Sequence, residues 1–280
     1  MKSIFLNKNW HPSWKQAYIH DLNDIYNCQK NIIDFKKLNL KNRGYTYAYA
    51  NRFQQTVNLI QKCVNPGGKI LDLAAGGGNF SLVLAELGYE VTWNDLREEL
   101  VDYVKLKYEK GKINYLPGNI FELDLEPNFD LILIAEVIEH VAYPDKFLEQ
   151  VSKYLKPGGH IIMTTPNGEY IRNQLPKFSD FPEPSKFESE QFKPDGDGHI
   201  FLLHIDEVEM LAKKSNLTVK EFYLINNFFT RGCLKTEQIL SITPYFIVEN
   251  IEKIINFLPL LIKKKLARGM CFILTNSASI

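Results

Sequence analysis

From residue 69 onward, short runs of apolar and β-branched residues alternate with segments whose apolar side chains recur at helical spacing. This alternation is typical of βαβ units, in which helices join and cover parallel strands. It predicts strands at Lys69–Leu73, Glu90–Asn94, Lys112–Leu116, Phe129–Ala135 and His160–Thr165. The continuous apolar run FDLILIA (129–135) indicates a strand that is buried on both faces. We therefore expect an α/β fold built around a parallel sheet.

Helices are expected between these strands, at about 79–87 and 98–110 and from Pro144 onward. The sequence KPGG (156–159) is expected to form the turn that ends the third of them. Asp206 and Glu209 have the spacing of a capping box, which predicts a helix that runs to about Ser215. Further strands are expected at 218–226 and 270–275.

Three regions interrupt this rhythm. Residues 1–45 are expected to form an N-terminal cap, and residues 228–267 a helical insertion that acts as a substrate lid or an oligomer contact. The core then comprises residues 46–227, and residues 268–280 supply its last strand. The long, aromatic-rich loop at 166–200 is also expected to act as a lid, since loops of this length in a compact domain are usually functional or disordered.

The charge balance limits the partners of the chain. Lysine plus arginine equal aspartate plus glutamate at 33 each, so no net field attracts nucleic acid, and we expect none as substrate. The four cysteines form no CxxC pair, which argues against a structural zinc site and a disulfide framework. The first residues lack the apolar core of a signal peptide, and no apolar run approaches the roughly 18 residues that cross a bilayer. A cytoplasmic protein is expected.

One segment, 244–266, has apolar residues at helical spacing followed by the lysines of LIKKK. Such a helix could lie on a membrane surface. More often it packs on its own domain or on a second subunit, and we favour these alternatives because the chain has no net charge. A homodimer is one expectation from this segment.

The stretch LDLAAGGGNFS (71–81) points to the ligand. A dinucleotide-binding turn, G-x-G-x-x-G, would place its third glycine at Ser81, which weakens a nicotinamide or flavin interpretation. Asp72 at the tip of the first strand instead suits a cationic ligand. S-adenosylmethionine carries a sulfonium and an ammonium group, and glycines let backbone approach its nucleoside closely because they have no Cβ.

This stretch resembles motif I, D-x-G-x-G-x-G, of the class I S-adenosylmethionine-dependent methyltransferases. Asp72, Ala74, Gly76 and Gly78 occupy the pattern, with alanine in place of the first glycine. The resemblance implies further cofactor contacts, in which a carboxylate binds both ribose hydroxyls, an apolar side chain packs on the adenine and a polar side chain accepts from its amino group. The corresponding residues are Asp95, Leu96 and Asn119, with Ile120 and Ala135 beside the cofactor.

Three later segments resemble a subgroup that includes quinone-biosynthesis O-methyltransferases and many sugar or natural-product methyltransferases. They are AEVIEHV (135–141), LKPGGHIIMTTPN (155–167) and GHIFLLHIDEVEMLAKKSNL (198–217). The resemblance implies a Rossmann-like sheet, mostly parallel with an antiparallel last strand, and a small-molecule acceptor.

Histidine is the residue most suited to act as a base at neutral pH. His140, after the fourth strand, and His199, at the end of the long loop, are our catalytic candidates, although either could have a purely structural role. Arg52 could bind the methionine carboxylate of the cofactor or remain a solvated charge. Glu136, Glu139 and His140 offer three metal ligands without a fourth at a defined spacing, so we expect no metal.

Three functions remain open from the sequence. The first, which we favour, is a small-molecule methyltransferase that methylates oxygen, with a hydroxyl acceptor and a base. The second is N-methylation of an amino sugar, an amino acid or a peptide-derived natural product, in which an uncharged amine needs no base. The third is a non-catalytic protein that binds S-adenosylmethionine.

Overall fold

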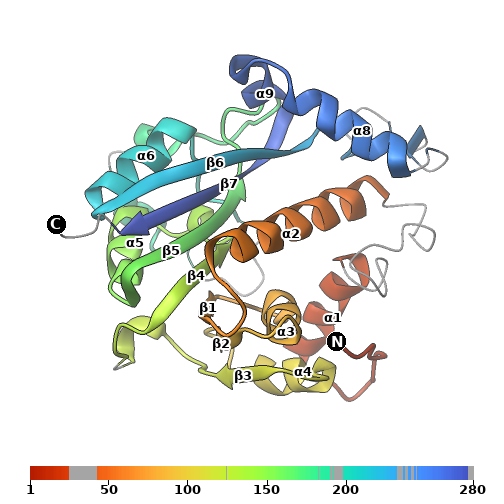
Figure 1. Ribbon diagram of the computed structural model, residues 1–280, viewed down its shortest axis with the longest axis vertical. Helices are drawn as coiled ribbons and strands as arrows, with labels where there is room; N and C mark the ends of the chain where they lie inside the picture. The colour runs from red at the N-terminus through yellow and green to blue at the C-terminus, as the bar shows by residue number, and fades with distance from the viewer. Residues whose placement is uncertain are drawn as a thin grey trace.

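The computed structural model describes residues 1–24 and 43–276, except 124, 182, 190, 192–197, 232–235, 237–238, 241–242 and 244. Part of the predicted N-terminal cap (25–42) and the end of the predicted last segment (277–280) lie outside the described residues. The described chain forms one twisted sheet with helices on both faces (Figure 1).

The sheet has seven strands in the order β3-β2-β1-β4-β5-β7-β6. Their bounds are β1 Lys69–Leu73, β2 Glu90–Asn94, β3 Lys112–Tyr115, β4 Phe129–Ala135, β5 Leu155–Pro166, β6 Leu217–Asn227 and β7 Ala267–Asn276. Strands β1 to β5 are parallel to one another, and β7 runs antiparallel to both β5 and β6. The predicted α/β architecture with an antiparallel last strand is confirmed.

The helices follow the predicted alternation. Their bounds are α1 Pro12–Asp24, α2 Arg43–Cys63, α3 Asn79–Glu86, α4 Leu100–Lys107, α5 Pro144–Ser152, α6 Ile205–Lys214, α8 Tyr245–Asn256 and α9 Leu260–Leu266. Short 3-10 helices occur at η4 Ile120–Glu122, η5 Ile138–His140, η6 Phe178–Asp180 and η7 Pro184–Phe187. Among the described residues, no helix combines the length and the apolar character needed to cross a membrane.

The central strand β4 is apolar along its whole length except at Asp130, near its start. Ile132 and Ile134 belong to the core under α5 and α6, whereas Leu131 and Leu133 belong to the core under α2 and α3. Successive strand residues point to opposite faces, so the covered middle of such a strand is apolar at every position, and the one carboxylate, Asp130, lies near the strand start, where it pairs with Lys156 (2.8 Å).

Two local predictions are wrong. KPGG is not the turn that ends α5: it lies inside β5, which begins at Leu155. Phe129 of β4 pairs with Leu155, and the ladder then shifts register before Leu131, while Gly158 takes a φ of +76°. The extra residues form an irregularity within the strand, which glycine tolerates.

The capping box of α6 is also displaced. The helix begins at Ile205, and Glu207, not Glu209, caps it by accepting a hydrogen bond from the backbone N–H of His204 (2.9 Å). The other oxygen of Glu207 accepts from the backbone N–H of Ser179 (2.7 Å), on the distant loop. This tertiary contact, together with burial of Ile205, fixes the helix start two residues earlier than the predicted capping box of Asp206 and Glu209 implies.

Candidate active site

A cavity of about 1370 Å³ opens at the carboxyl ends of the parallel strands. Leu73 of β1, Asn94 of β2, Glu136 after β4 and Pro166 of β5 all line it. This edge is where open α/β sheets bind ligands, because the loops after several strands converge there. The volume exceeds the roughly 300–1,000 Å³ usual for one drug-sized ligand, so two reactants have room to meet.

The loop between β1 and α3 brings bare backbone to the cavity wall. Ala74 and Gly76 both line the cavity with left-handed φ values of +54° and +51°. Gly78 lies behind them: its φ is +71°, and a Cβ there would approach Cγ1 of Val104 on α4 to 2.7 Å. The loop can therefore turn tightly and lie against α4 only with glycine at position 78.

The carboxylate of Asp95 faces this loop and is held rigidly. Its Oδ2 accepts from the backbone N–H of Gly76 (2.8 Å), and its Oδ1 accepts from the backbone N–H of Arg97 (2.9 Å). The Arg97 guanidinium contacts the same carboxylate at 2.9 Å, and the Asp95 side chain is 5% exposed. The guanidinium also donates to Oδ2 (3.2 Å), so two neighbouring hydroxyls, such as those of a ribose, can bind this carboxylate when they replace the Arg97 side chain.

Other predicted cofactor residues also reach the cavity. Leu96, Asn119 and Ile120 line it next to Asp95. The Asn119 side chain caps η4 by accepting from the backbone N–H of Phe121 (3.2 Å) and donates to Glu122 (2.8 Å). Leu96 is 49% exposed, so an apolar side chain is presented to whatever lies in the cavity.

Asp72, Gly78 and Ala135 do not line the cavity. Asp72 is 2% exposed and accepts a hydrogen bond from the hydroxyl of Ser81 (2.6 Å) beneath the glycine loop. Burial raises the pKa of Asp72 to about 7, and the negative charge of Asp95 adds to this effect, although the Ser81 hydrogen bonds oppose it.

Arg52 on α2 lies in the cavity wall and forms an ion pair with Glu136 at 2.7 Å. Glu136 follows β4 directly and has a left-handed φ of +57°. Both side chains are about one-quarter exposed, so the pair borders the cavity. An arginine in this position can turn to a second carboxylate that enters the cavity.

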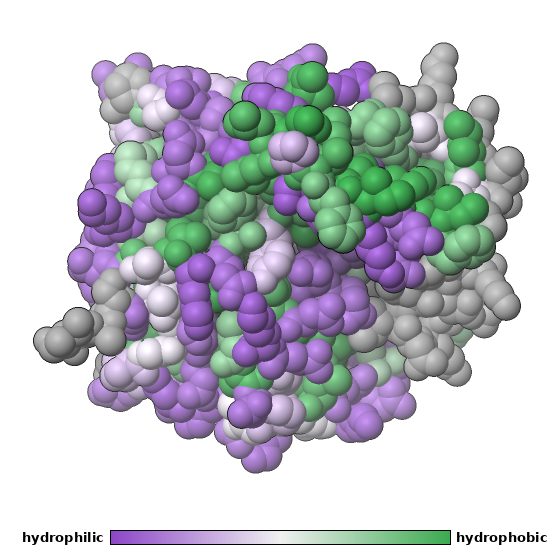
Figure 2. Space-filling model, turned by 45° about the horizontal axis from the view of Figure 1, so that its top comes forward, coloured by the Kyte–Doolittle hydropathy of each residue, from purple (hydrophilic) through white to green (hydrophobic). Residues whose placement is uncertain are grey.

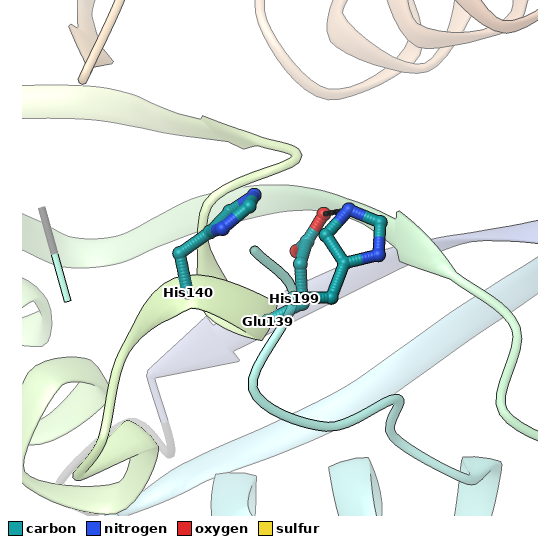
Figure 3. Close-up of side chains that lie close together, drawn as sticks. All are labelled: Glu139, His140 and His199. Carbon is teal, nitrogen blue, oxygen red and sulfur yellow. Dashed lines mark ion pairs between the residues drawn. The ribbon is translucent and has the colours of Figure 1, made fainter. Parts of the chain in front are cut away.

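Both predicted catalytic histidines line the same cavity, and their rings are 4.9 Å apart (Figure 3). The Nδ1 atom of His140 lies 3.1 Å from the carbonyl oxygen of Gly198. Since a carbonyl only accepts, this contact assigns the proton to Nδ1 and leaves Nε2 as an acceptor. His140 is thus held in the tautomer that a general base needs.

Glu139 completes the cluster, with its Oε1 atom 4.0 Å from Nε2 of His199 (Figure 3). Its side chain is fully buried; Oε2 accepts from the hydroxyl of Thr165 (3.0 Å), and Oε1 has no hydrogen-bond partner. Burial, reinforced by the charge of Glu136, raises the pKa of Glu139 well above its ordinary value. The cluster therefore places a buried carboxyl group with a raised pKa beside the two histidines.

The same three residues could hold a metal ion. One ligand atom each from Glu139, His140 and His199 lies within 4.8 Å of the others. Two histidines and one glutamate with an open position form a known ligand set for catalytic zinc. The sequence suggested Glu136, Glu139 and His140 as the possible ligand group, whereas the fold groups Glu139 and His140 with His199.

Sequence reasoning did not identify the role of Glu139 or the cavity residues of α1, which are Gln16, Ala17, His20 and Asp21. It also missed arginines 172, 231 and 268, which line the same cavity. One signal for the placement of His199 was available. The apolar run IFLL follows it directly, and Ile200, Phe201 and Leu203 of this run belong to the main core. The backbone N–H of Ile200 donates to the carbonyl oxygen of Glu139 (2.9 Å).

Comparison with known families agrees with this geometry. Residues 45–221, more than half of the chain, match a family model described as a methyltransferase domain. The chain is 34% identical over 155 residues to the ubiquinone biosynthesis O-methyltransferase of Rickettsia prowazekii, covering 48% of this chain and 62% of that protein. It is 33% identical over 141 residues to the enzyme of the same name from Xanthomonas campestris pv. campestris (43% and 59%). The aligned part thus spans less than two thirds of these relatives.

Solved structures show the same fold at low identity. A methyltransferase from Mesorhizobium loti described as S-adenosylmethionine dependent has a TM-score of 0.53 at 14% identity, covering 85% of this chain and all of that one. A SAM-dependent methyltransferase from Methanosarcina mazei has a TM-score of 0.52 at 16% identity, covering 78% and 96%. These similarities describe the arrangement of the sheet and its helices.

Proposed function

Because the chain belongs to the methyltransferase-domain family, we propose that it transfers a methyl group from S-adenosylmethionine to a hydroxyl group of a small molecule. The observation that carries this proposal is the pairing, in one cavity, of Asp95 beside the bare glycine loop with the two histidines after β4 and before α6. Asp95 and the glycine loop can bind a nucleoside, and the histidines can accept a proton. The names of the curated relatives support methylation of oxygen.

The chain fits the proposed donor. Gly76 and Gly77 present backbone without Cβ atoms to the cavity, and Asp95 offers a fixed carboxylate next to them. In this assignment Asp95 binds the ribose hydroxyls, Leu96 and Ile120 contact the adenine, and Arg52 binds the carboxylate of the methionine part. Asp72, beneath the loop, contributes a negative potential toward the ammonium group.

S-adenosylmethionine supplies an electrophilic methyl group, which an acceptor oxygen takes as the carbon–sulfur bond breaks and its electron pair stays on sulfur. Nε2 of His140 accepts the proton that the acceptor hydroxyl loses. Most of the rate enhancement comes from the cavity itself, which aligns the two reactants and removes water from between them. Glu139 lies next to the histidine pair, with its Oε1 facing His199.

A specific observation favours a second version of this mechanism. Oε1 of Glu139 is buried without a hydrogen-bond partner, and such an atom is often satisfied by an ion. A divalent cation held by Glu139, His140 and His199 would lower the pKa of a bound hydroxyl, so that the histidines would be ligands and not bases.

Calorimetry with S-adenosylhomocysteine tests the donor site. The wild-type protein should bind it, and Asp95→Ala should weaken binding by about 10- to 100-fold, because hydrogen bonds to a charged group contribute roughly 1.5–3 kcal/mol each. Asp102→Ala is the matched control, since Asp102 is a 71% exposed carboxylate on α4 away from the cavity. Absence of binding heat with the wild-type protein would refute the proposal.

The surface formed by α8 and α9 carries exposed apolar side chains and could contact a second copy of the chain or a membrane. Apolar side chains gather there (Figure 2), including Phe246, Ile254, Phe257 and Leu261, which are 62–90% exposed. We propose that this surface contacts a second copy of the chain, because a chain of zero net charge has little attraction to an anionic membrane. Flotation of the protein with anionic vesicles would contradict this. A cytoplasmic location is likewise our proposal, and the free thiols of Cys63 and Cys271 support it.

A further inference from the structure

The N-terminal helix α1 forms one wall of the cavity. Gln16, Ala17, His20 and Asp21 line it together with Gly76 and Gly77 of the glycine loop. In Figure 1 the helix lies beside α3 and α4. The glycine loop leads directly into α3. A ligand lying on the glycine loop would therefore be covered by α1.

Asp21 anchors the helix in a buried polar network. Its Oδ2 accepts from Nζ of Lys107 at the end of α4 (2.7 Å) and from the hydroxyl of Tyr103, and its Oδ1 accepts from the side-chain amide of Asn79 (2.8 Å). Lys107 also donates to Oδ1 of Asn79 (2.8 Å). The Asp21 and Lys107 side chains are only 3% and 1% exposed.

This network reaches the donor site through Asn79. Asn79 is the first residue of α3, directly after Gly78, and it lines the cavity itself. A Cβ on Gly77 would lie 3.3 Å from Nζ of Lys107 and 3.4 Å from Oδ1 of Asp21. The ion pair therefore lies directly beside the glycine loop, in the space that a side chain at position 77 would enter.

A second set of contacts holds α1 from outside the cavity. The indole N–H of Trp14 donates to the backbone carbonyl of Glu99, and the hydroxyl of Ser13 donates to the Glu99 carboxylate (2.6 Å). Trp10 packs edge-on against the ring of Tyr103 at 5.9 Å. Trp14 and Ser13 do not line the cavity, so they can affect a bound ligand only through the position of α1.

We expect α1 to be either fully docked or undocked, with few intermediate positions. Burial lowers the pKa of Lys107, and Asp21 opposes this effect, so the ammonium group depends on α1 for its compensating charge. If α1 leaves, Lys107 and Asn79 lose partners together. A ligand that touches both walls binds only the closed state well, and its binding must then favour closure by an equal free energy.

We propose that α1 is a lid over the donor site, and that Asp21 and Lys107 are positioning residues that hold it closed against the glycine loop. The proposal rests on the proposed function, since the ligand beneath the lid is the methyl donor or its product. Closure excludes water from the reacting atoms, and opening admits the donor.

Binding of S-adenosylhomocysteine to variants tests the lid. Asp21→Asn keeps the shape of the side chain but removes the charge, and Trp14→Phe removes one anchoring hydrogen bond outside the cavity. Both should weaken binding at least 10-fold and raise the KM for the donor, with kcat at saturating donor changed less than threefold. The matched control is Val151→Ala, a fully buried core change on α5 that lowers Tm but should leave donor affinity unchanged.

Hydrogen exchange gives an independent measurement on the wild-type protein. Amides of α1 should become more protected when S-adenosylhomocysteine is added, and this gain should shrink in Trp14→Phe. If the wild-type protein binds the product but both variants bind it equally well, or α1 protection does not change, the lid is refuted and the donor site stands. If the wild-type protein does not bind, the proposed function and the lid both fail.

Discussion

Oε1 of Glu139 lies 4.0 Å from Nε2 of His199, although sixty residues separate them in the chain. Glu139 is in η5 after β4, and His199 is on the segment that leads into α6. The acid is fully buried, whereas the base is one-third exposed to the cavity. A buried carboxyl group with a raised pKa beside a histidine at a ligand cavity is typical of a site that moves a proton.

Replacement of His140 by glutamine should lower kcat by about 10²- to 10⁴-fold, which is the usual contribution of a general base. Donor affinity should be unchanged, because His140 lies on the acceptor side of the cavity in our assignment. The variant His11→Gln is the control, since His11 is exposed and does not line the cavity. A loss smaller than about threefold would indicate an acceptor that needs no base, such as an uncharged amine.

Removal of divalent cations separates the two versions of the mechanism. If His140 acts as a base without a metal, dialysis against EDTA leaves kcat unchanged, and added Mg²⁺, Mn²⁺ or Zn²⁺ has no effect. Activity that disappears with EDTA and returns with one of these ions would assign the cluster to a cation. In that case Glu139→Gln should weaken the ion's restoring effect, because one of the three ligands loses its charge.

Asp72 should make stability depend on pH. Its pKa in the folded protein is about 7, above the ordinary 3.8, so the folded state resists its ionisation and the unfolded state does not. Stability is therefore lost as pH rises from about 4 to about 7, by at most about 4 kcal/mol for a shift of three units. In urea denaturation, the free energy of unfolding of Asp72→Asn relative to the wild-type protein should increase as pH rises from about 4 to about 7. The corresponding difference for Asp102→Asn should not change with pH.

Ionisation of Asp72 should also change the affinity for the donor, and it should raise this affinity although it lowers stability. Ionised Asp72 attracts the ammonium group of the donor, so affinity should rise as pH increases through about 7. Calorimetry between pH 5.5 and 8.5 measures this slope, which should be absent in Asp72→Asn. An equal slope in both proteins would remove Asp72 from the donor site.

The glycine loop gives a prediction on backbone strain. Ala74 has a φ of +54°, which costs an alanine about 1–2 kcal/mol, so Ala74→Gly should raise the free energy of unfolding by about 0.5–1 kcal/mol after the entropy cost of glycine. Gly78→Ala should lower it by about 2–3 kcal/mol, because the new Cβ would meet Val104 at 2.7 Å as well as taking a left-handed φ.

Chemical denaturation checks both substitutions, and a double variant tests the cause. Val104→Ala removes both methyl groups that the new Cβ would contact, so Gly78→Ala should cost less in that background. An equal cost in both backgrounds would attribute the effect to the backbone φ alone.

The sequence was sufficient for everything that depends on local periodicity. Strands β1, β2 and β4 have the bounds that the apolar runs predict, because a run of apolar residues leaves little choice between the two faces of a covered sheet. The glycine loop and Asp95 were also predictable, since a fixed spacing along a βαβ unit places them at the same edge of the sheet.

Contacts between distant segments could not be read in this way. The irregularity at KPGG depends on pairing with Phe129, and the start of α6 depends on a hydrogen bond between Glu207 and Ser179. Asp21 and Lys107, eighty-six residues apart, look like ordinary surface charges until the fold buries them together. The local sequence pattern thus determined the strands and the glycine loop. The partner of each buried charge was decided only by tertiary packing. A buried charge is stable only when an opposite charge or a hydrogen-bonding group lies next to it, and that group comes from a distant part of the chain.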